Sequence, residues 1–164
     1  MSHSATPDQH GISAELLSGT WFVVRTTLPM WRSWHSPSIS YTPLPDGQIV
    51  DTVRAERGSQ TRLIIGLDTP LARAGAFQWR GVTPLTRWTP SRWEVAAYDA
   101  GGAWLVSLFG RTPFTPAGMD ICTRTPYVLP DLEGQILSVL RGQPQTAKHL
   151  PQLFAPQQTP RASW

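Results

Sequence analysis

The sequence contains a single cysteine, Cys122, so no disulfide can form within the chain. Small secreted domains usually carry several disulfides, whereas chains kept in a reducing compartment do not. The opening stretch MSHSATPDQHGISAELL also lacks the basic region and apolar run of a secretory signal. We therefore expect a cytoplasmic protein in which Cys122 is a buried, unreactive thiol.

Lysine and long apolar runs are also scarce. Lys148 is the only lysine among 14 basic residues, and the arginines are scattered singly through a chain of net charge +3. Nucleic-acid binding needs basic residues clustered on one face, so we expect no nucleic-acid partner. No stretch approaches the ~18 consecutive apolar residues of a membrane-spanning helix, so we expect no membrane span.

The motifs of several common enzyme and metal sites are missing. The chain has no G-x-S-x-G elbow, no P-loop and no dinucleotide-binding fingerprint. Its four histidines have no metal-ligand spacing, and His3, His10 and His149 lie in segments that we expect to be tails. We therefore expect neither a metal nor a cofactor.

The composition that remains is typical of one globular domain. Hydrophobic residues make up 40% of the 164 residues and charged residues 15%, which favours a packed core over a disordered chain. We expect the polar stretch 1–12 to be disordered and residues 13–142 to form the domain. The Gln/Pro-rich stretch 143–164 is expected to be a tail.

Short runs rich in β-branched and aromatic residues alternate with turn signals from Gly19 to Thr125. PDG (45–47) and AGG (100–102) are typical of hairpin turns that need a positive φ. The runs predict eight strands, at 20–27, 38–44, 49–56, 62–68, 76–82, 92–99, 103–109 and 119–125.

A helix is predicted after the last strand. In PDLEGQILSVLRG, over 130–142, the residues Leu132, Ile136, Val139 and Leu140 recur at helical spacing. Together these elements favour an all-β fold, an eight-stranded antiparallel up-and-down barrel with one C-terminal α-helix. Such a barrel can enclose one small ligand. An immunoglobulin-like sandwich is the alternative, which the late helix disfavours.

Several stretches resemble the lipocalins, a family within the calycins, over residues 15–142. Gly19-Thr20-Trp21 matches their G-x-W signature, and MDICTRTPYVLPDLEGQILSVL resembles the strand, Arg-Thr-Pro step and helix that end bacterial and plant members. YTPLPDGQIVDTVRAERG and WEVAAYDAGGAWLVSL are similar to their second hairpin and to their sixth and seventh strands. Without a signal peptide or disulfide, the chain looks like a cytoplasmic bacterial and fungal branch.

The resemblance implies a closed barrel floor and a ligand in the cavity. It places Arg124 over Trp21, next to Gly19, as structural, barrel-closing residues. It also implies that the barrel binds a small hydrophobic molecule. Some lipocalin-like barrels of natural-product pathways are cofactor-free cyclases or isomerases, so the resemblance leaves an enzyme open as well.

The remaining tryptophans are candidates for a cavity wall and a lid. Strand side chains alternate between faces, so Phe77 with Trp79, Trp93 with Val95 and Ala97, and Trp104 with Val106 and Leu108 each share a face. If those faces point inward, their aromatic side chains either line a wide cavity or simply form an ordinary core. In the opposite arrangement the tryptophans coat the outside of the barrel, and Arg80 and Glu94 point inward. Trp31, Trp34 and Trp88 lie in connecting segments. We expect Trp31 and Trp34 to cover the mouth of the barrel, with packing on the core as the alternative.

Three polar residues complete the candidate site. Counting by twos from Trp21 puts Arg25 inside the barrel, where its guanidinium could anchor an anionic group of the ligand or pair with Glu94, Asp51 or Asp120. Glu94 and His35 are the candidate catalytic residues if the protein is an enzyme, because either could move a proton.

The sequence therefore predicts a protein that binds one small, largely apolar molecule of aromatic, isoprenoid or polyketide-like structure. The alternative is a cofactor-free cyclase or isomerase of secondary metabolism that uses the same cavity. A third reading is a protein-binding module that uses the tail. We expect a monomer or a weak homodimer.

Overall fold

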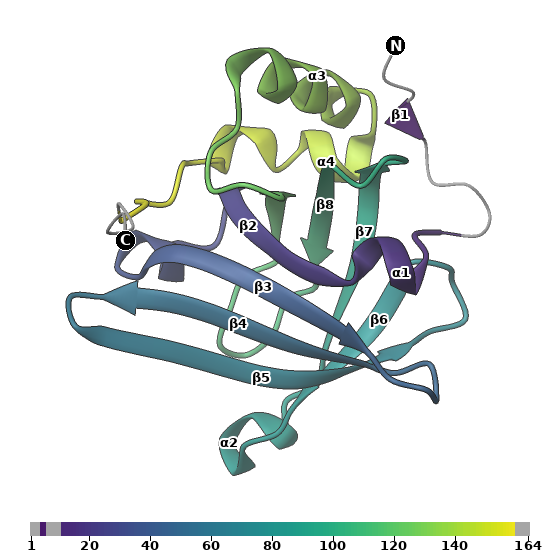
Figure 1. Ribbon diagram of the computed structural model, residues 1–164, viewed down its shortest axis with the longest axis vertical. Helices are drawn as coiled ribbons and strands as arrows, with labels where there is room; N and C mark the ends of the chain where they lie inside the picture. The colour runs from purple at the N-terminus through teal and green to yellow at the C-terminus, as the bar shows by residue number, and fades with distance from the viewer. Residues whose placement is uncertain (1–3, 6–10, 160–164) are drawn as a thin grey trace.

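The computed structural model describes residues 4–5 and 11–159, and its centre is a closed β-barrel (Figure 1). Each strand pairs antiparallel with the next, and the last barrel strand, β9, pairs with the first, β2, so the sheet closes on itself. The predicted all-β, eight-stranded antiparallel barrel is confirmed, and the sandwich is excluded. A closed barrel of this type is consistent with a calycin fold.

The eight barrel strands lie close to their predicted positions. They are β2 (Gly19–Thr26), β3 (His35–Pro43), β4 (Ile49–Arg57), β5 (Gln60–Pro70), β6 (Ala76–Gly81), β7 (Ser91–Asp99), β8 (Trp104–Phe109) and β9 (Gly118–Thr123). A two-residue strand, β1 (Ser4–Ala5), pairs with the end of β7. The tight turn between β3 and β4 contains Gly47 at φ 88°, as the PDG sequence predicts.

Helical segments cap the barrel and cover one side of it. They are α1 (Ala14–Leu17), η1 (Pro29–Arg32), α2 (Pro84–Arg87), α3 (Pro130–Arg141), α4 (Pro144–Ala147) and η2 (Leu150–Gln152). The predicted C-terminal helix is therefore present as α3, which Gly142 terminates. Figure 1 shows α3 and α4 together on one side of the barrel, near β2 and β8, and α2 projecting from the opposite side. Within the described residues, no helix has both the length and the apolarity needed to cross a membrane.

Two of the three β-bulges in the described strands, those in β2 and β7, decide which buried side chains face into the barrel; the third lies in β3 between His35 and Ser38. Val24 has no partner on β9, because Val23 pairs with Cys122 and Arg25 with the next residue, Ile121. Ala96 is likewise skipped in the pairing of β7 with β8. An extra residue reverses the alternation of faces. Residues beyond each bulge therefore point to the side opposite to that given by counting in twos.

The reversal divides the buried apolar side chains into two layers. Trp21, Val23, Leu105 and Cys122 belong to the inner core of the barrel. A second, outer core lies between the barrel wall and α3; its members are Val24, Ala97, Trp104, Val106, Met119, Ile121, Ile136 and Leu140. The apolar stripe of α3 thus covers the wall, as helical spacing requires.

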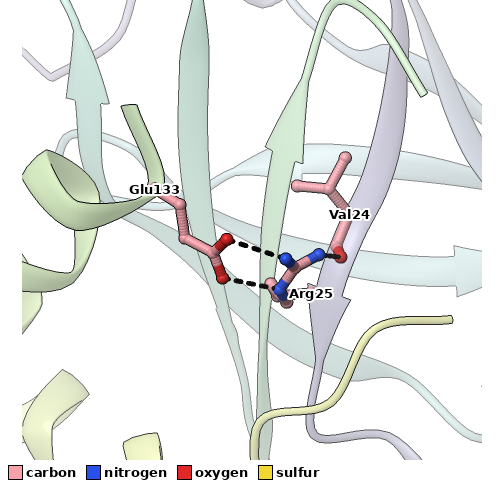
Figure 2. A network of polar contacts seen from close by, with 3 residues as sticks. All are labelled: Val24, Arg25 and Glu133. Carbon is pink, nitrogen blue, oxygen red and sulfur yellow. Dashed lines mark hydrogen bonds and ion pairs between the residues drawn. The ribbon is translucent and has the colours of Figure 1, made fainter. Parts of the chain in front are cut away.

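The first bulge also places Arg25 on the outside, contrary to the sequence prediction. Its Nε and Nη2 each lie 2.7 Å from a carboxylate oxygen of Glu133 on α3, and its Nη1 donates to the carbonyl of Val24 (Figure 2). This two-pronged ion pair, with side chains about one quarter exposed, ties the helix to β2. Arg25 is therefore not an anchor inside the barrel.

The C-terminal segment folds back onto the barrel as far as it is described. Thr146 of α4 is fully buried, and Phe154 forms two backbone hydrogen bonds of 2.9 Å with Thr26, just where β2 ends. Residues 143–159, assigned to a tail on composition, are thus packed, because their few apolar side chains are enough to cover the outer core. Most of segment 1–12 lies outside the described residues, but Ile12 is part of the inner core.

Arg124 lies at the closed end of the barrel. Its guanidinium is 3.5 Å from the ring centroid of Trp21 and donates to the carbonyls of Leu16, Thr20 and Gly102. Trp21 donates in turn to the carbonyl of Leu17. These contacts join α1 to the start of the first barrel strand and to the end of the last one.

We predict that Arg124→Leu lowers the free energy of unfolding by about 2 kcal/mol, because it removes a cation–π contact and leaves carbonyls without donors. The measurement is urea denaturation followed by tryptophan fluorescence. Arg111→Leu, at an exposed arginine of the β8–β9 loop, is the matched control and should change stability by less than about 0.5 kcal/mol. Equal effects of the two changes would contradict a barrel-closing role.

Candidate functional site

Three stacked aromatic rings cross the interior of the barrel. Trp93 of β7 stacks on Tyr41 of β3, with centroids 5.5 Å apart, and on Phe77 of β6, at 4.7 Å; both pairs are inclined by 22°. All three side chains are almost fully buried. Offset stacks of this kind are favourable beyond the area that they bury. Phe77 and Trp93 therefore lie inside the barrel together with Tyr41, which the sequence did not single out, while their role as the wall of a ligand site stays a prediction.

Two aspartates lie beside this stack, and each accepts a hydrogen bond from an indole. Trp93 Nε1 donates to Asp68 Oδ1 at 2.8 Å, and Trp79 Nε1 donates to Asp51 Oδ1 at 2.9 Å. Asp51 on β4 and Asp68 on β5 are 5% and 0% exposed. The Trp79 ring lies across Gly66, where any side chain would overlap it. Glycine at this position therefore makes room for the indole that holds Asp51.

The two carboxyl groups form a coupled pair. Burial first, and then the neighbouring Asp51, raise the pKa of Asp68 to about 9, while the hydrogen bond from Trp93 lowers it. Burial also raises the pKa of Asp51, while the neighbouring Asp68 carboxyl and the hydrogen bonds from Trp79 and the Gly66 backbone lower it. The consistent state at neutral pH is a protonated Asp68 beside Asp51, with Asp68 Oδ2 buried and without a hydrogen-bond partner among the described residues. The pair thus holds one proton out of contact with water.

A third buried carboxyl lies on β9. Asp120 accepts a hydrogen bond of 2.5 Å from Thr26 Oγ1 and is 1% exposed. Burial raises the pKa of Asp120 to about 7, although the bond from Thr26 lowers it. Ser107, its paired residue on β8, has a fully buried Oγ with no hydrogen-bond partner among the described residues. The interior therefore contains an acid that is partly ionised near neutral pH.

The buried polar groups are unbalanced in charge. The buried residues with ionisable acidic side chains include Asp51, Asp68 and Asp120, while no arginine, lysine or histidine of the described residues is buried. Without a cation to pair with, the charged form of a buried carboxyl is disfavoured. This explains why the pKa values of all three rise.

Trp31 lies over the mouth of the barrel. It belongs to η1, is 4% exposed, and packs in a cluster with Leu28, Ala55, Val53 and Phe109. Ala55 and Val53 share the inner face of β4 with Asp51, so Trp31 packs against inward-facing side chains at this end of the barrel. Its role as a lid over a ligand stays a prediction. Within residues 4–5 and 11–159, its buried Nε1 has no hydrogen-bond partner, which is a costly arrangement for an indole.

Trp34 lies further out, at the rim. Its ring faces the guanidinium groups of Arg57 and Arg62 on the β4–β5 hairpin, 4.4 and 5.4 Å from the ring centroid. Trp88, in the segment after α2, is 79% exposed and covers nothing. Of the three loop tryptophans, Trp31 closes the mouth and Trp34 lines its edge.

Three predicted site residues lie away from the interior. Trp104 belongs to the outer core under α3, because its face of β8 is the outer one. Glu94 alternates with the inward Trp93 and Val95, so it points outward, where it pairs with Arg73 at 3.1 Å. His35 is half-buried at the start of β3, opposite Glu56. Together with Arg25, these residues are not brought to the acid pair.

The acid pair itself was missed by sequence reasoning, although the signal was present. Asp51 alternates with Ile49 and Val53, and Asp68 pairs directly with Ile49. A carboxylate on the apolar face of a strand is unusual. Asp51 and Asp120 were considered only as partners for Arg25, and Asp68 was not considered.

The cavities found around the described residues do not include the acid pair. A cavity of about 170 Å³ lies at the closed end, beside Ile12, Ile49 and Phe77, and larger ones lie outside the barrel. Stacked rings and the Trp31 side chain fill much of the inside. A ligand of more than a few atoms can enter only if η1 moves and Trp31 leaves its place.

Comparison with known proteins adds no assignment: no family model matches the sequence, and no curated protein matches it. Among the described residues, no group of three or more His, Cys, Asp or Glu is arranged to hold a metal ion. The site must therefore be interpreted from its own chemistry.

We predict that stability falls as pH rises above about 4, because Asp68 and Asp120 keep their protons in the folded state and lose them near pH 4 when unfolded. Their contribution is complete below pH 4 and is lost as pH rises through about 7 for Asp120 and about 9 for Asp68. The slope per carboxyl is at most about 1.4 kcal/mol per pH unit.

Urea denaturation at several pH values measures this slope in the variants. Asp68→Asn should flatten the decline between pH 7 and 9, whereas Asp120→Asn should flatten it only below 7. The exposed Asp131→Asn on α3 is the control and should leave the decline between pH 7 and 9 unchanged. An unchanged slope in Asp68→Asn would show that this carboxyl is already ionised in the folded protein.

Proposed function

We propose that the barrel binds one small, largely apolar molecule, of aromatic, isoprenoid or polyketide-like structure, in the space now filled by Trp31. The observation that carries the proposal is the acid pair Asp51/Asp68, set against stacked aromatic rings and closed off by a lid with an unpaired indole. The proposal includes a place among the cytoplasmic calycin-like barrels, which the single cysteine fits. The protein would act as a monomer or a weak homodimer.

The buried carboxyls support binding over simple packing. Burying a carboxyl in an apolar interior destabilises a protein by several kcal/mol unless it is well paired, and an apolar residue of the same volume would avoid that loss. Polar groups retained at such a cost concentrate at functional sites. Here they provide the few convergent polar contacts that orient a ligand in a mostly apolar pocket.

The lid supports binding as well. An indole at the mouth occupies the volume of a bicyclic ring, and its unpaired Nε1 loses nothing when it swings into water. A ligand with an aromatic or alicyclic body can replace its contacts with Ala55 and Phe109. Opening the lid is then an exchange of one apolar group for another.

An enzyme is the second candidate, and the acid pair specifically favours it. A carboxyl that stays protonated at neutral pH in a dry site can act as a general acid, and its ionised neighbour can take the proton back. The reaction class that fits is a cofactor-free isomerisation or cyclisation, with Asp68 as proton donor. Glu94 and His35 no longer fit that role, because Glu94 points outward and His35 lies at the rim.

We predict that the wild-type protein retains at least one compound from a lipophilic extract of its source organism, with one molecule bound per chain in native mass spectrometry. Ala55→Phe fills the space under Trp31 and should abolish retention. Arg54→Phe, on the adjacent outward position of β4, is the matched control and should keep it. Circular dichroism and a thermal melt check that both variants fold.

Two outcomes would contradict binding in the barrel. One is that nothing is retained by the wild-type protein. The other is that folded Ala55→Phe retains the same compound as well as Arg54→Phe does. Trp31→Ala provides a second measurement, since opening the lid should speed both association and dissociation.

If the protein is an enzyme, the compound should be isomerised or cyclised, and Asp68→Asn should slow the conversion at least about 100-fold while retention persists. Chromatography of the extract before and after incubation measures the conversion, with Asp131→Asn as the control. A comparable loss in Glu94→Gln or His35→Ala, with Asp68→Asn active, would instead assign the proton transfer to the residues that sequence reasoning favoured.

A further inference from the structure

A groove of about 730 Å³ lies mainly on the outside of the barrel, and it also reaches Trp93 and Phe109, which belong to or pack against the inner core. One side is formed by β7 and by the β5–β6 loop, and the other by the segment that follows α3. Its volume is within the range of small-molecule sites in proteins. The groove exists only because residues 143–159 fold back onto the barrel.

The segment that forms the second side of the groove is attached to the rest of the protein both before and after its groove-lining residues. Thr146 Oγ1 donates to the carbonyl of Leu140 at 2.7 Å, which fixes α4 against the end of α3. Phe154 is fixed by its backbone pair with Thr26. Lys148 and His149 lie between these two attachments, so their position relative to β7 is defined by the fold.

The floor of the groove is apolar. Its side chains come from the β5–β6 loop, the outer faces of β6 and β8, and the start of β9; they include Leu71, Ala72, Ala76, Leu108 and Ala117. Because small side chains predominate, the floor leaves room for a bound molecule. Such a surface takes up an aliphatic or aromatic body.

The rim of the groove is cationic. Arg73, Arg92 and Lys148 line it, against a single carboxylate, Glu94. His149 lies beside them as a neutral imidazole, because burial and the adjacent Lys148 lower its pKa. Glu94 is already paired with Arg73 at 3.1 Å. Among the described residues, neither Arg92 nor Lys148 has an ion pair or a side-chain hydrogen bond, so two full positive charges face the groove without partners.

We propose that this groove binds an organic oxyanion with an apolar body, whose head group pairs with Arg92 and Lys148 while its body covers the alanine-rich floor. A planar guanidinium and a flexible ammonium together suit either a carboxylate or a phosphate monoester head. This site is independent of binding inside the barrel. It would make the outer wall a second ligand site on the same molecule.

The test uses three naphthalene probes that share one apolar body: 2-naphthoate, 2-naphthyl phosphate and the neutral 2-naphthalenemethanol. We expect at least one of the two anions to bind at least tenfold more tightly than the alcohol in fluorescence titrations at low ionic strength. Comparing the two anions identifies the head group. The amide signals of Ala72 and Gly110 should shift in two-dimensional NMR spectra.

Variants of the groove residues test whether the probe binds in the groove. Arg92→Gln combined with Lys148→Gln should weaken binding of the better anion at least tenfold and leave the alcohol unchanged. Glu94→Gln should tighten anion binding about threefold, because it frees Arg73. Arg54→Gln, an exposed arginine on β4 with the same charge change, is the control and should have no effect.

Several results would overturn the proposal: equal affinity for anions and alcohol, no binding of either anion, or undiminished binding in the double variant. Binding that is lost in Ala55→Phe but kept in the double variant would place the probe in the barrel. That last outcome would support the proposed function and reject the groove, so the two hypotheses fail separately.

Discussion

The position of Trp93 determines the organisation of the barrel interior. Its ring stacks on both Tyr41 and Phe77, and its Nε1 donates to Asp68, so one side chain links β3, β5, β6 and β7. Asp68 can stay buried because this indole donates to one of its oxygens and because its raised pKa keeps the carboxyl uncharged at neutral pH. The aromatic stack and the acid pair are therefore one structure, and neither can be altered without the other.

The outside of the barrel is organised by a different constraint, the bulge at Val24. It turns Val24 toward α3 and aims Arg25 at Glu133, so that one irregular residue supplies both an apolar and an ionic contact for the helix. Behind the helix, the chain returns along the wall and creates the cationic groove. Interior and exterior thus offer chemically opposite sites, carboxyls inside and unpaired cations outside.

The strands could be predicted from the sequence because the alternation of apolar residues and the turn signals are local properties. Which face points inward could not be predicted beyond Val24 and Ala96, since a bulge depends on the pairing partner; this is why Arg25 was placed inside. Trp104 was placed inside the barrel for a different reason. The alternation of faces along β8 is regular, but the face that carries Trp104 packs under α3. Asp68 was visible as a carboxylate in an apolar run, yet its partners lie 25 and 17 residues away in Trp93 and Asp51.

The pairing of β2 with β9 has a consequence for how the protein is made. Phe22 pairs with Thr123, and Thr26 with Phe154, so the first strand must wait for the last before the sheet can close. Non-local pairing of this kind makes folding slow. Until β9 pairs with β2, the sheet has two open edges and no closed interior. The burial of Asp68 and Asp120, and the proton uptake that their raised pKa values require, therefore belong to the closure of the barrel.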